Sequence, residues 1–105
     1  MELHENLGIK KDLLLQIQYI ISKCSHVKKA VIFGSRARGD YKINSDIDIA
    51  IIGENVSYKD LNFIENGLSE LNTALDFDIV PFEKISKTEL RKNIYQDGVE
   101  IYVNE

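Results

Sequence analysis

Two short apolar runs, each ended by a glycine, most constrain what this chain can fold into. Lys29–Phe33 is rich in β-branched and aromatic residues and stops at Gly34, which predicts a buried strand followed by a tight turn. Asp46–Ile52 predicts a second strand, closed by Gly53, with Asp48 among otherwise apolar residues. An unpaired carboxylate in such a run is costly to bury. We therefore expect the second strand to contribute to a functional site as well as to a core.

Helical periodicity is found on both sides of these strands. Apolar residues recur at steps of three and four, which predicts an amphipathic helix near residues 9–25: Ile9, Leu13, Ile17, Ile20, Ile21 and Cys24. A short helix is expected directly after Gly34. A further helix is expected to open at Ser57, because Asp60 then lies near its amino terminus and Val56 can pack on Leu61.

The last third of the chain predicts a strand, a helix and a strand. Leu75–Val80 alternates apolar and polar residues, as a half-buried strand does. A helix over about residues 87–97 follows the capping-box pattern Ser86-Lys87-Thr88-Glu89 and stops at Gly98. Residues 99–103 alternate again and predict a short final strand.

These elements predict one domain over residues 1–105, of the α/β or α+β class, with a small mixed β-sheet and helices packed over it. The 105 residues are 44% hydrophobic and 29% charged, as in ordinary globular domains. The longest apolar runs, about five residues, are too short to cross a bilayer. No secretory signal is recognised, so a cytoplasmic location is expected. Cys24 is expected in the core and offers neither an internal disulfide nor a zinc site.

The charge pattern indicates what the chain binds. The net charge of −4 argues against direct binding of duplex nucleic acid, which needs a basic face. Arg36, Arg38 and Lys42 nevertheless flank the Gly34-Ser35 turn. A local cluster of this kind favours a polyphosphate as the target.

Asp46 and Asp48 lie on one face of the predicted strand, because side chains alternate along a strand. Two like charges there are unfavourable unless a cation lies between them. Hard oxygen ligands favour magnesium or manganese over zinc, and two carboxylates are suited to a two-metal site. Taken alone, Asp46 as a strand cap and Asp48 facing solvent would be the simpler explanation, but the apolar run around Asp48 argues against it.

The turn after the first strand is suited to phosphate. Gly34 allows close approach of a ligand to the backbone, and the Ser35 hydroxyl and the amides that follow can bond phosphate oxygens. Arg36 and Arg38 could clamp non-bridging oxygens, or each could be a solvated surface residue. A P-loop is excluded because Asp40-Tyr41 replaces the required Lys-Ser/Thr.

Asp78 adds a third carboxylate on a separate strand. Such a group near an attacking hydroxyl can accept its proton. Asp76 lies on the same face of that strand and is the competing candidate.

Gly34-Ser35, ten further residues, then Asp46-x-Asp48 and later Asp78 resemble the minimal nucleotidyltransferases of the DNA polymerase beta superfamily. The resemblance runs from Val31 to Tyr102 and implies a polymerase beta-like palm fold. It implies that Asp46, Asp48 and Asp78 are catalytic and hold the metals. Gly34 and Ser35, with Arg36 and Arg38, would bind the nucleotide. Phe77-Asp78-Ile79-Val80 resembles the family pattern better than the stretch around Asp76.

The resemblance also implies a function. Family members of this size are commonly encoded beside a small helical HEPN-type protein and act as its antitoxin. Some transfer AMP to a tyrosine of that partner. The leading hypothesis is a Mg²⁺-dependent transfer of AMP from ATP to such a tyrosine, with two ions, Mn²⁺ being possible in their place. The alternatives are transfer to a small molecule such as an aminoglycoside, and a non-catalytic antitoxin that acts by binding alone.

Overall fold

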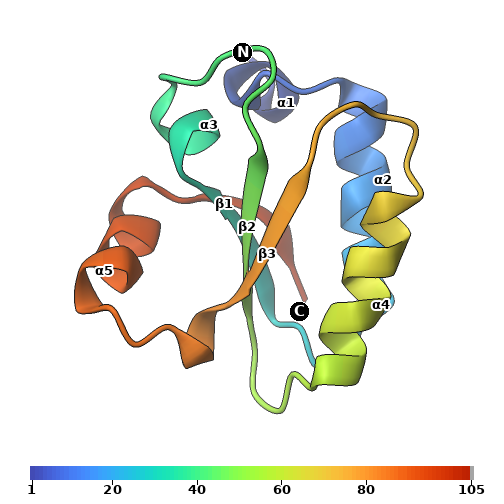
Figure 1. The fold of residues 1–105 in the computed structure, drawn as a ribbon, viewed down its shortest axis with the longest axis vertical. Coiled ribbons are helices and arrows are strands. Elements are labelled where there is room, and N and C mark those ends of the chain that lie inside the picture. Colours follow the sequence, from blue (N-terminus) through green and yellow to red (C-terminus); the bar gives the residue numbers. More distant parts are fainter. Residues whose placement is uncertain (105) are drawn as a thin grey trace.

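Residues 1–104 are described in the structure, a computed structural model. Four strands form one mixed sheet in the order β3-β2-β1-β4 (Figure 1). They are β1 (Lys29–Phe33), β2 (Ile47–Ile52), β3 (Phe77–Pro81) and β4 (Val99–Val103). β1 runs antiparallel to both of its neighbours, and β2 and β3 are parallel. The small mixed sheet predicted from the sequence is confirmed, and β1 has the predicted bounds.

The helices are α1 (Leu3–Leu7), α2 (Lys11–Ser22), α3 (Ser35–Arg38), α4 (Tyr58–Ser69) and α5 (Thr88–Asp97), with a 3-10 turn, η1 (Phe82–Lys84), after β3. The single helix predicted near residues 9–25 is wrong at its start. A separate α1 ends at Gly8, which has a left-handed conformation, and α2 begins only at Lys11. Ile9 is still buried, in the linker between the two helices.

The predicted start of α4 is confirmed. Ser57 precedes the helix, and its hydroxyl accepts a hydrogen bond from the Asp60 amide at 3.2 Å. The Asp60 carboxylate accepts one from the Ser57 amide at 3.0 Å. The capping box predicted at Ser86 is wrong, because α5 is preceded by Lys87 and has no side-chain cap. The segment before α5 is held instead by Arg91, whose guanidinium donates to the Ile85 carbonyl at 3.1 Å.

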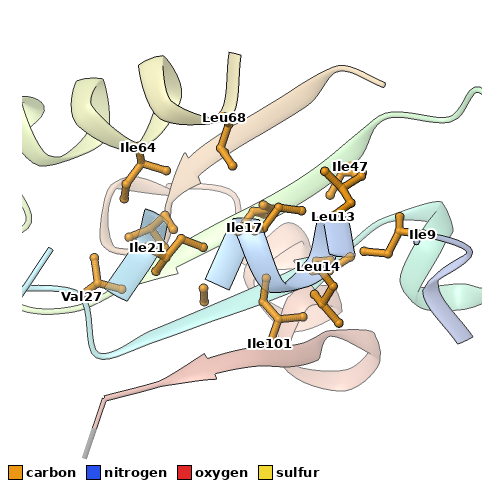
Figure 2. Close-up of a cluster of buried hydrophobic side chains, with 14 of the residues drawn as sticks. Ile9, Leu13, Leu14, Ile17, Ile21, Val27, Ile47, Ile64, Leu68 and Ile101 are labelled. Carbon is orange, nitrogen blue, oxygen red and sulfur yellow. The ribbon is translucent and has the colours of Figure 1, made fainter. Parts of the chain in front are cut away.

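Two apolar clusters cover the two faces of the sheet. The larger lies between the sheet and α1, α2 and α4 (Figure 2) and includes Ile17, Ile49 and Ile64. Cys24 is buried in it, as predicted. The smaller cluster, on the face that carries η1 and α5, is formed by Val31, Ala50, Phe82, Ile85 and Ile94. Part of this second face is therefore left open, beyond the end of the smaller cluster.

The structure was also searched for membrane-spanning elements. Over residues 1–104, none of the helices combines the length and the apolar character that crossing a membrane requires.

Candidate active site

Asp48 and Asp78 are direct neighbours on adjacent strands. In the parallel pairing of β2 with β3, Asp48 is in register with Asp78. Ala50 and Val80, two residues further along each strand, pack in the smaller cluster. Because side chains two apart share a face, both carboxylates lie on the face of the sheet that carries α5. The side chains of Asp48 and Asp78 are therefore adjacent across the two strands.

Asp46 lies just outside β2, which begins at Ile47 rather than at Asp46 as predicted. The Ile47 amide donates to the Asp76 carbonyl at 2.9 Å, so the backbone beyond Asp46 is already paired with the chain that leads into β3. Asp46 and Asp78 are both exposed, whereas Asp48 is partly buried. The exposed carboxylates of Asp46 and Asp78 thus lie near the partly buried carboxylate of Asp48, where β2 and β3 begin.

The pKa of the Asp48 carboxyl is shifted by its burial and by its charged neighbours. Burial raises the pKa of its carboxyl, and the nearby Asp78 and Asp46 raise it further, while Arg38 lowers it. Three acidic groups and one arginine are therefore close enough to interact electrostatically at one place. Asp76 makes no comparable contribution to Asp48, which favours Asp78 as the third member of the site.

Gly34 brings the chain against this cluster. It has φ 77° and ψ −153°, a conformation that is essentially restricted to glycine. A Cβ added at Gly34 would overlap the Oδ2 atom of Asp48. β1 pairs with β2 so that Phe33 faces Asp48, and the next residue passes directly over the carboxylate. A glycine is needed here both for the backbone conformation and for the space.

Ser35 opens α3, the short helix expected after the first strand. The amides of Ala37 and Arg38 donate to the Gly34 carbonyl at 3.2 and 3.1 Å. The earlier amides, those of Ser35 and Arg36, are therefore the ones left to meet a phosphate. The Ser35 hydroxyl makes no hydrogen bond to any other residue within 1–104. It is partly exposed and is free to accept or donate to a ligand.

The two arginines of the turn have different roles. Arg38 is exposed, lies 3.5 Å from the Asp40 carboxylate and lowers the pKa of Asp48, so its charge acts on the site. Arg36 is only 1% exposed. Its guanidinium donates to the Ser45 carbonyl at 2.8 Å and to the Gly8 carbonyl at 3.0 Å.

These contacts correct the expectation that Arg36 clamps phosphate, because its donors are directed to the backbone. Further bonds reach the carbonyls of Leu7 at 3.1 Å and Ile43 at 3.3 Å. Arg36 therefore ties the end of α1 to the loop that immediately precedes Asp46. Sequence reasoning missed this positioning role, since backbone carbonyls from distant segments carry no residue signature.

The donor set is suited to a hard divalent cation. Asp46, Asp48 and Asp78 offer carboxylate oxygens, which magnesium and manganese prefer. Burial, and then repulsion by Asp78 and Asp46, raises the pKa of Asp48, and a bound cation would relieve that repulsion. The carboxylate oxygens of these three residues do not, however, all lie within 4.8 Å of one another. In the described part of the chain, the ligand atoms that lie within 4.8 Å of one another belong to Glu2, His4 and Glu5 at the start of α1, where His4 is partly buried and the two glutamates are exposed.

Comparison with known proteins shows which family the chain matches. The family described as "Polymerase beta, Nucleotidyltransferase" matches residues 15–105. The Methanocaldococcus jannaschii protein named "Putative protein adenylyltransferase MJ1217" is 35% identical over 92 residues, which cover 87% of this chain and 93% of that protein.

Two solved structures share the fold. A chain in the crystal structure of a toxin–antitoxin with AMP-PNP superposes with a TM-score of 0.68 at 20% identity, covering 92% of this chain and 76% of that one. A chain in the complex of the tri-AMPylated HEPN toxin of Shewanella oneidensis with MNT antitoxin gives a TM-score of 0.60 at 20% identity, covering 88% and 73%. From the family match, the identity to the Methanocaldococcus protein and this shared fold, the chain belongs to the polymerase beta nucleotidyltransferase family and is a nucleotidyltransferase.

Proposed function

We propose that this nucleotidyltransferase uses ATP and Mg²⁺ to transfer AMP to a tyrosine hydroxyl of a HEPN-type partner protein, whose toxicity it neutralises. The observation that carries the proposal is the pairing of Asp48 with Asp78 on adjacent strands, with Asp46 nearby and Gly34 directly against the Asp48 carboxylate. Carboxylates, a glycine turn and an unpaired hydroxyl at one place provide both a metal-binding and a phosphate-binding surface.

The proposed reaction is a displacement at the α-phosphorus. The acceptor oxygen forms a bond to the α-phosphorus, the bond between the α-phosphorus and the oxygen that joins it to the β-phosphorus breaks, pyrophosphate leaves with that oxygen, and the acceptor proton passes to the Asp78 carboxylate. Ser35 and the first amides of α3 bind the triphosphate, and Arg38 offsets its charge. Asp46, Asp48 and Asp78 would hold Mg²⁺, which when bound neutralises the charge that develops on the phosphates.

The proposed partner and acceptor are supported by the relatives. The Methanocaldococcus protein is named an adenylyltransferase that acts on protein. The Shewanella structure contains an AMPylated HEPN toxin beside an MNT antitoxin. The three carboxylates of this chain are all present and grouped, which favours catalysis over an antitoxin that acts only by binding.

The test uses the protein together with a HEPN-type protein encoded beside it. The pair is incubated with Mg²⁺ and ATP labelled either at the α- or at the γ-phosphate. The proposal expects label from the α-position on the partner, on tyrosine in mass spectrometry, and none from the γ-position. Asp48→Asn is the matched control and should transfer nothing. The proposal would be contradicted if the wild type transferred no AMP and Asp48→Asn neutralised the toxin as well as the wild type does.

A further inference from the structure

β3 forms one edge of the sheet and borders a groove. Among residues 1–104, the strand pairs only with β2, and α4 packs beside it (Figure 1). A groove of about 520 Å³ runs along this edge. Its walls come from the end of α4, the loop that follows it, and β3, and they include Leu68, Leu71, Leu75 and Phe77. Asp78 also lines it, so the groove runs along the strand that carries a carboxylate of the proposed active site.

The free edge of β3 is short and has a defined register. The Asp76 carbonyl is directed to β2, where it accepts from the Ile47 amide. Because successive backbone groups of a strand point to opposite sides, the N–H and C=O groups of Phe77 and Ile79 are directed away from β2. Pro81 has no N–H and ends the edge. The available hydrogen-bonding positions therefore lie on either side of Asp78.

The two sheet faces beside this edge differ in character. Phe77 and Ile79 pack on the larger apolar cluster, toward α4, whereas Asp78 lies on the opposite face with Asp48. A strand added to β3 would place one residue beside Asp78, about 4.5–5.5 Å away between Cβ atoms. Its two sequence neighbours would point into the apolar part of the groove.

The groove is acidic as well as apolar. Glu65, Asp76 and Asp78 line it, and no lysine, arginine or histidine of the described residues does. Asp78 is in the proposed catalytic set, but Glu65 and Asp76 remain as charges that a basic partner segment can pair with. An acidic segment would meet electrostatic repulsion here.

We propose that the β3 edge is the acceptor-binding site, where an extended basic segment of the acceptor protein adds as a fifth strand. The segment's hydroxyl-bearing residue lies beside Asp78, and apolar residues on both sides of it fill the groove next to α4. Edge-strand addition of this kind takes affinity from backbone hydrogen bonds and selectivity from pockets for alternate side chains. The inference rests on the proposed function, because it supplies the substrate for the same site.

The first test measures binding without any reaction. The full chain, labelled with ¹⁵N, is titrated with the synthetic peptide acetyl-Lys-Val-Tyr-Val-Lys-amide to about 1 mM. The proposal expects the amide signals of Phe77 and Ile79 to shift together, and a peptide with glutamates in place of both lysines to bind at least about tenfold more weakly. Absence of shifts at these two amides would overturn the proposal, as would shifts that follow protein concentration alone and so indicate edge-to-edge pairing of two copies.

The second test blocks the groove with a matched pair of substitutions. Ala74 lines the groove, whereas Asn72, two residues earlier in the same loop, does not. Ala74→Trp should weaken peptide binding and raise the KM for the protein acceptor by roughly tenfold. Asn72→Trp should leave both within about twofold. Equal effects of the two substitutions would overturn the acceptor site.

Mg²⁺-ATP affinity separates the two proposals. It should be unchanged in Ala74→Trp and Asn72→Trp. If the wild type does not bind Mg²⁺-ATP, the proposed function is wrong. The peptide titration tests the groove whether or not Mg²⁺-ATP binds.

Discussion

Replacing Gly34 by alanine tests how closely the turn and the carboxylates depend on each other. The chain offers a matched control in Gly39, five residues later at the end of α3. Both glycines have positive φ, 77° for Gly34 and 93° for Gly39, so alanine is strained at either position. Only at Gly34 does the added Cβ overlap Asp48. At Gly39 it meets no atom within 4 Å.

The expected magnitudes follow from this difference. Backbone strain costs on the order of 1–3 kcal/mol at each position, and each kcal/mol lowers Tm by roughly 4–8 °C in a domain of about this size. Both variants should therefore lose stability. In Gly34→Ala the Asp48 carboxylate must also move, and a displacement of about 1 Å in an active site can reduce the rate by 10²-fold. Gly39→Ala should stay within about threefold of the wild-type rate.

The assay combines urea unfolding, Mg²⁺-ATP titration and single-turnover transfer, all at a temperature where both variants are folded. The expected result is destabilisation of both variants, greater in Gly34→Ala because of the overlap with Asp48, and a large loss of activity in Gly34→Ala alone. Equal loss of transfer in the two variants would refute the reasoning, because the overlap with Asp48 would then have no separate effect. Wild-type transfer by Gly34→Ala would refute it more directly.

Three further predictions concern single side chains of the site. Ser35→Ala should weaken nucleotide use by roughly 10- to 100-fold, since a hydrogen bond to a charged group contributes about 1.5–3 kcal/mol; steady-state kinetics within twofold of wild type would count against it. Asp78→Asn should reduce single-turnover transfer by at least about 10²-fold with nucleotide binding retained, whereas Asp76→Asn should do much less, and the reverse order would identify Asp76 as the proton acceptor. Burial and the acidic neighbours of Asp48 raise the pKa of its carboxyl, so the folded metal-free protein keeps this proton to a higher pH than the unfolded chain does. The free energy of unfolding therefore falls as the pH rises from the pKa of the unfolded chain through that of the folded protein. Metal-free Asp48→Asn should therefore be more stable than wild type at neutral pH, with the difference closing in acid, and urea unfolding at several pH values would reveal a constant difference if this is wrong.

The sequence predicted those parts of the fold that depend on local pattern. The apolar run that stops at Gly34 predicted β1 with its observed bounds, because a buried strand is a continuous apolar segment ended by a turn. The start of α4 was predicted because Ser57 and Asp60 cap the helix through contacts three residues apart. Asp48 stood out because it is a carboxylate within a nearly continuous apolar run, where burial without a partner is costly.

Features that depend on distant contacts could not be predicted in this way. Arg36 stands in a turn among phosphate-binding residues, and its sequence position gives no sign of its burial against the end of α1. The pairing of Asp48 with Asp78 required the parallel register of β2 and β3, which no local spacing specifies.

The central claim is that the grouped carboxylates form one metal-dependent nucleotide site. Calorimetric titration of ATP in the presence and absence of Mg²⁺ tests it most directly, with the wild type, Asp46→Asn and Asp48→Asn compared under one condition. The account predicts that wild type binds ATP in a Mg²⁺-dependent manner and that each variant, still folded, loses this binding by at least about tenfold. Mg²⁺-ATP affinity unchanged in both variants would contradict it.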